Sequence, residues 1–85
     1  MNKDTLITDS SFRETIKALF IHGPLFDGDI PSKSGRDKAV DGGYVFRFQG
    51  YQSLTILGLE LALNLNFDRD KERYYRALRE SSSGQ

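Results

Sequence analysis

The sequence contains no cysteine and no tryptophan, and it has one histidine and one methionine. Without cysteine the chain can form neither a disulfide nor a thiolate metal site. No apolar run reaches the roughly 18 residues that span a bilayer. The start, MNKDTLITDSS, lacks the apolar core of a signal peptide. We therefore predict a cytoplasmic protein that does not enter a membrane.

Residues that could carry out catalysis are also scarce. His22 ends an apolar segment beside Gly23, where a contact at a helix C-terminus explains it better than acid–base chemistry. The serines and aspartates lack the context of a nucleophile elbow or a triad. The segment 27–29, Asp-Gly-Asp, is not followed by the remaining ligands of a calcium loop. The sequence predicts no enzyme, no catalytic residue, no metal ligand and no cofactor.

Charge gives no strong indication of a partner. The chain has twelve basic and twelve acidic residues, so its formal charge is zero. Residues 31–52 are the most basic part, with four basic and two acidic side chains. Affinity for duplex DNA comes largely from neutralised phosphates. Charge alone therefore supports nucleic-acid binding only weakly.

The length of 85 residues allows one small domain. We place this domain at residues 1–80. The remaining residues, 81–85, read SSSGQ, a composition that predicts a disordered tail.

Two helices are predicted in the first half of the chain. The first covers residues 11–21, where Ser11 and Glu14 have the spacing of a capping box. The second begins after a connector rich in glycine, proline and aspartate, and is capped by Ser32 or Ser34. It should end near residue 41, before a pair of glycines.

After these glycines the pattern changes to a period of two. Tyr44, Phe46 and Phe48 alternate with other residues, which is typical of a half-buried strand. Gly50 marks a turn, and residues 52–55 would return as a second strand. The pattern predicts a two-stranded antiparallel β-hairpin.

Two further helices complete the prediction. Thr55 would cap a helix at residues 56–64, and Asp68 would cap a last helix that reaches Glu80. The expected fold class is α+β, with three to four helices and the hairpin.

Residues 11–63 resemble winged helix-turn-helix domains of the PadR-like and MarR-like families. The resemblance rests on Gly43-Tyr44-Val45, Arg47, Leu54-Thr55 and Gly58. It implies a winged-helix-like fold, in which the helix before the hairpin reads DNA and the hairpin is the wing. The segment GDIPSKSGRD, residues 28–37, is similar to small phage- or prophage-encoded proteins.

If the resemblance extends to function, the chain is a DNA-binding transcriptional regulator that contacts double-stranded DNA. The residues expected at the DNA are Lys33, Ser34, Arg36 and Lys38 in the helix and Arg47 and Gln49 in the hairpin, with Tyr51 and Gln52 beside them. The alternative is a solvated helix face interrupted by Asp37 and Asp41, followed by an ordinary hairpin.

The last predicted helix offers a second candidate surface. Tyr74, Tyr75 and Leu78 would form a partner interface, and the resemblance implies a homodimer through this helix. Alternatively, these side chains pack on their own domain. The rival to DNA binding is a protein-interaction module on a winged-helix scaffold, such as a phage-derived modulator or inhibitor of a host complex.

Overall fold

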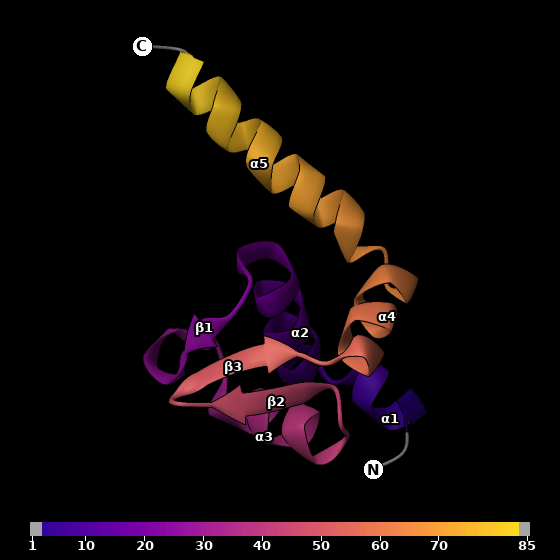
Figure 1. Cartoon of the computed structure of the whole chain (residues 1–85). Helices are drawn as coiled ribbons and strands as arrows, with labels where there is room; N and C mark the ends of the chain where they lie inside the picture. Colours follow the sequence, from indigo (N-terminus) through magenta and orange to yellow (C-terminus); the bar gives the residue numbers. More distant parts are fainter. Residues whose placement is uncertain (1–2, 84–85) are drawn as a thin grey trace.

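The computed structural model describes residues 3–83 and shows an elongated molecule of 46 × 28 × 20 Å, from which the last helix extends (Figure 1). The elements in chain order are α1 (Lys3–Thr8), α2 (Ser10–His22), β1 (Leu25–Phe26), the 3₁₀ helix η1 (Asp27–Asp29), α3 (Lys33–Asp41), β2 (Val45–Phe48), β3 (Tyr51–Leu54), α4 (Ile56–Asn64) and α5 (Phe67–Ser83). The fold class is α+β, as expected.

Helix α2 supplies the largest part of the core. Phe12 and Ile16 are fully buried on one face of this helix, at the spacing that the sequence predicts. The predicted capping box is wrong, because α2 begins before Ser11. Asp9 is the N-cap: its carboxylate accepts hydrogen bonds from the Phe12 amide at 3.0 Å and from the Ser11 hydroxyl at 2.6 Å. Aspartate caps a helix N-terminus as well as serine does, so the residue types alone do not decide between Asp9 and Ser11 as the N-cap.

The sheet has three antiparallel strands in the order β1-β3-β2. The sequence pattern does not predict β1, which lies inside the predicted connector and pairs Leu25 with Gln52 and Phe26 with Tyr51. A strand of two residues has no period that a sequence pattern could reveal. The hairpin is confirmed. Its two-residue turn has positive φ at Gln49 (50°) and Gly50 (83°), as a type I′ turn requires.

The hairpin buries a different set of residues from the one expected. Tyr44 is buried in the loop before β2, where its ring meets that of Phe12 edge-on with centroids 5.5 Å apart. Within β2 it is Val45 that is buried, whereas Phe46 and Phe48 are 48% and 63% exposed. Tyr44 is therefore buried, whereas the strand itself turns the rings of Phe46 and Phe48 to solvent.

Helix α3 packs directly against α2. Its N-cap is Ser32, whose hydroxyl accepts a hydrogen bond from the Gly35 amide at 3.0 Å. A Cβ on Gly35 would lie 2.1 Å from the carbonyl oxygen of Ser11. The glycine that seems unfavourable inside a helix therefore permits the close approach of the two helices.

The C-terminal helices follow the sheet. Thr55 caps α4 as predicted: its hydroxyl accepts from the Gly58 amide at 3.1 Å and donates to the Gly43 carbonyl at 2.6 Å. Asp68 is not a cap but the second residue of α5. This helix begins directly after Asn66, whose φ is 62°.

Helix α5 extends beyond the expected end at Glu80 to Ser83, and residues 84–85 of the predicted tail lie outside the described part of the chain. Its first turns pack on the end of α2, and the rest runs away from the other elements (Figure 1).

Candidate functional site

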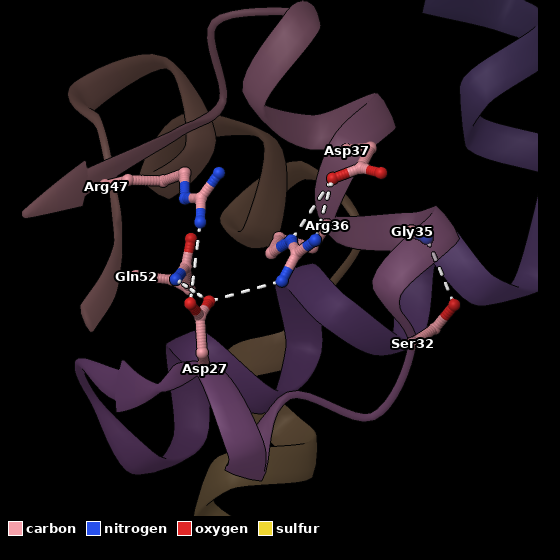
Figure 2. Close-up of polar contacts among 7 residues, drawn as sticks. All are labelled: Asp27, Ser32, Gly35, Arg36, Asp37, Arg47 and Gln52. Atoms are coloured by element: carbon pink, nitrogen blue, oxygen red, sulfur yellow. Dashed lines mark hydrogen bonds and ion pairs between the residues drawn. The ribbon is translucent and has the colours of Figure 1, made fainter. Parts of the chain in front are cut away.

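Two of the four cations predicted to touch DNA, Arg36 and Arg47, meet at a single carboxylate. Asp27, in η1 between β1 and α3, accepts from Arg36 Nη1 at 3.2 Å and from Arg47 Nη2 at 3.4 Å. Gln52 Nε2 donates to the same carboxylate oxygen as Arg36. Figure 2 shows the side chains from α3, β2 and β3 converging on Asp27. We call Asp27, Arg36, Arg47 and Gln52 the Asp27 cluster.

The members of the cluster differ in burial. The side chain of Arg36 is 13% exposed, that of Asp27 37% and that of Arg47 52%, and Gln52 is fully buried. Arg36 also donates from Nε (3.2 Å) and Nη2 (3.1 Å) to Asp37 Oδ1. Its guanidinium therefore lies between two carboxylates, and its net charge toward an outside ligand is largely cancelled.

Lys38 is also paired. Its ammonium donates to Asp9, the N-cap of α2, across the contact between α2 and α3. This hydrogen bond, with those from Ser11 and the Phe12 amide, holds the pKa of Asp9 well below its ordinary value of 3.8. Lys38 thus fixes α3 to the start of α2.

The three remaining predicted residues are exposed. Lys33 and Ser34 lie in the first turn of α3, and Gln49 lies in the hairpin turn. Of the four cations predicted at the DNA, Lys33 alone makes no ion pair within residues 3–83. The fold brings α3 and the hairpin together as expected. Their arginines, however, are paired with a carboxylate of the same chain, Asp27.

The outer side of the sheet carries a group of rings that sequence analysis did not identify as a surface. Phe26 and Phe48 both pair with Tyr51, and Phe46 is two residues from Phe48 along β2. Residues directly opposite in an antiparallel sheet share a face, as do residues two apart. All four rings are 48–63% exposed. We call Phe26, Phe46, Phe48 and Tyr51 the aromatic face.

The rings of this face also touch one another. Phe26 and Tyr51 meet edge-on with centroids 5.2 Å apart. On the opposite side of the sheet, Gln52 pairs with Leu25 and Arg47. The signal that could have revealed the face is the hairpin register. A two-residue turn at Gln49-Gly50 places Phe48 opposite Tyr51, on the side away from the buried Val45.

Helix α4 exposes a second apolar surface that the sequence analysis did not propose. Leu61 and Ala62 face the core. The exposed apolar residues of α4 are Ile56 at 78%, Leu57 at 47%, Leu59 at 44% and Leu63 at 49%. The signal was the composition ILGLELALN, which is apolar on every side of the helix and exceeds what one core contact can bury.

The predicted interface on α5 is partly used within the chain. The Tyr75 hydroxyl donates to the Ile21 carbonyl of α2 at 3.1 Å, and the Tyr74 ring meets the His22 ring edge-on at 5.1 Å. Tyr74, Tyr75 and Leu78 nevertheless stay 39%, 46% and 47% exposed. His22, the last residue of α2, thus packs its ring against α5.

Comparisons of the chain with protein-family models, with curated proteins and with solved structures gave no match. The five α-helices and the three-stranded antiparallel sheet of residues 3–83 are compatible with a winged-helix-like fold. No helix among residues 3–83 is both long enough and apolar enough to cross a bilayer.

Proposed function

We propose that this chain is a protein-interaction module on a winged-helix scaffold, and that the aromatic face is its main docking surface. The scaffold assignment is supported by the order of elements, with α3 in the place of a recognition helix and β2–β3 in that of a wing. The single observation that carries the proposal is the aromatic face itself.

Exposed rings are costly on a surface that has no partner. Each aromatic side chain buries about 150–250 Å² when it is covered, so four half-exposed rings offer about 400 Å². That is within the range of the largest apolar patches on monomers, which are often functional. It is also about half the area that one partner contributes to a stable complex. Aromatic residues are typical hot spots of such complexes.

DNA binding is the second candidate, favoured by the exposed Lys33 and Ser34 at the N-terminus of α3. The salt dependence of duplex binding grows with the number of phosphates that a protein neutralises. Arg36, Lys38 and Arg47 are already paired with aspartates of the same chain. The protein-interaction module is therefore the better conclusion.

The test begins with affinity capture from the source cells, followed by calorimetry with the purified partner. We expect Phe48→Ser to weaken the complex at least about tenfold, which corresponds to about 1.4 kcal/mol. Ile56→Ser is the matched control, because it removes an exposed apolar side chain on α4, outside the aromatic face and outside the predicted interface on α5. Equal affinities of the wild type and Phe48→Ser would remove the aromatic face from the interface. Tight, salt-dependent binding of random duplex DNA by the wild type would favour the second candidate.

A further inference from the structure

We infer that Arg36, Arg47 and Gln52 form an oxyanion-binding site that the chain keeps closed with its own Asp27 carboxylate. The ligand that this site would accept is a phosphate group. The inference does not depend on the proposed function, because it concerns the side of the sheet opposite the aromatic face.

The arrangement of donors is that of an anion site. Two guanidinium groups and one amide point at one carboxylate from three different elements (Figure 2). Arginine presents its donors in a rigid planar fork that suits carboxylate and phosphate equally. A phosphate oxygen could therefore take the place of either Asp27 oxygen without a change in donor chemistry.

Gln52 supplies the third donor of the site through its Nε2. The residue is fully buried, and its Oε1 accepts no hydrogen bond from any described residue. A buried amide oxygen without a donor destabilises the folded state. The amide is therefore held in place by what its nitrogen donates to, which is Asp27.

Asp27 closes the site through proximity. A ligand on the same chain acts at a high effective concentration, in the millimolar range even for flexible links. Asp27 is held more rigidly than a ligand on a flexible link, because its backbone amide donates to the Gly50 carbonyl at 2.9 Å. A phosphate from solution thus competes poorly, and the arginines contribute little to binding while Asp27 remains.

The experiment compares Asp27→Asn with Asp29→Asn. Both variants remove one negative charge from η1, but Asp29 makes no ion pair or side-chain hydrogen bond among the described residues. Asparagine at position 27 keeps one oxygen that can accept from Gln52 and Arg36. Its amide nitrogen cannot accept a hydrogen bond, so Arg47 is released. Binding of a short random DNA duplex is measured by fluorescence anisotropy. A second arm measures the unfolding temperature in inorganic phosphate and in chloride at equal ionic strength.

We expect Asp27→Asn to bind the duplex at least about tenfold more tightly than Asp29→Asn at low salt. One added phosphate contact, from the released Arg47, steepens the salt dependence by about 0.9, so raising salt from about 50 to 200 mM removes about 3.5-fold in the added affinity. Adding Arg47→Gln should reverse the gain. A response to inorganic phosphate without duplex binding would also support the site and would identify free phosphate as its ligand.

The inference fails if Asp27→Asn and Asp29→Asn respond equally to duplex and to inorganic phosphate. Circular dichroism establishes that both variants are folded. If Asp27→Asn does not fold, Asp27→Ser replaces it, because its hydroxyl keeps a polar group beside Gln52. Duplex binding by the wild type would count against the proposed function. The difference between the two variants would still decide the inference.

Discussion

Replacing Gly35 with alanine tests how closely α2 and α3 approach. A Cβ at this position would lie 2.1 Å from the Ser11 carbonyl oxygen, 2.6 Å from its carbonyl carbon and 2.6 Å from Thr15 Oγ1. Ordinary contact begins near 3.4 Å, so the two helices would have to separate by more than 1 Å. The obstacle is backbone, which cannot turn away as a long side chain can.

Two effects oppose each other in this variant. Alanine gains about 1 kcal/mol over glycine inside a helix. Overpacking of a tight contact costs about 1–3 kcal/mol and sometimes more. The separation would also disturb the fully buried Phe12 and Ala39. Because the overlap is with backbone, the upper end of this cost applies, and we expect a net loss of about 2 kcal/mol, which lowers the melting temperature of a domain of this size by about 8–16 °C.

The assay is urea unfolding followed by circular dichroism, with Gly28→Ala as the matched control. Gly28 lies in η1, has no positive φ, and has nothing within 4 Å of its Cβ position. Its replacement should change the free energy of unfolding by less than about 0.5 kcal/mol. If Gly35→Ala were as stable as the wild type, the close contact between α2 and α3 would be refuted.

Two further predictions concern single contacts. The folded-state pKa of Asp9 is lowered, so the carboxylate contributes stability at pH values above about 4, and this contribution is lost as the pH falls below that value. Asp9→Asn should therefore flatten the decline of stability between pH 5 and pH 2 in urea titrations, and an unchanged slope would contradict the Lys38 and Ser11 contacts. Tyr75→Phe should cost about 0.5–1.5 kcal/mol, because the Ile21 carbonyl at the end of α2 loses its donor. Tyr74→Phe should be nearly neutral, and equal losses in the two variants would argue against the Tyr75 bond.

The parts of the fold that the sequence predicts are those set by local rules. Thr55 followed three residues later by Gly58 is a cap that depends on four neighbouring residues, and the structure has it. The hairpin turn is equally local. Gly35 shows the limit of this reasoning, because its role is a contact with Ser11, 24 positions earlier in the sequence. Helix propensity alone makes this glycine look misplaced.

The candidate site depends even more on tertiary structure. The sequence places Arg36 and Arg47 on a helix and a hairpin that lie together, and both assignments are confirmed. It does not indicate that Asp27, in a glycine-rich connector, reaches both cations from 9 and 20 positions away. Nor does alternation alone say which side of β2 faces the core. Val45 is buried instead of the larger Phe46 because the pairing of β2 with β3 and the packing of α3 against β2 decide the side.

Strand β2 has a consequence for how the protein behaves at high concentration. It is an edge strand with the sequence Val-Phe-Arg-Phe, and β3 is its neighbour on one side. Open edges rich in β-branched and aromatic residues recruit other strands, and a charge on the edge normally discourages this. Arg47 is the one charge in β2, and Asp27 neutralises it. The carboxylate that closes the anion site thus also removes the electrostatic repulsion between two β2 edges, so purification and refolding should favour dilute conditions.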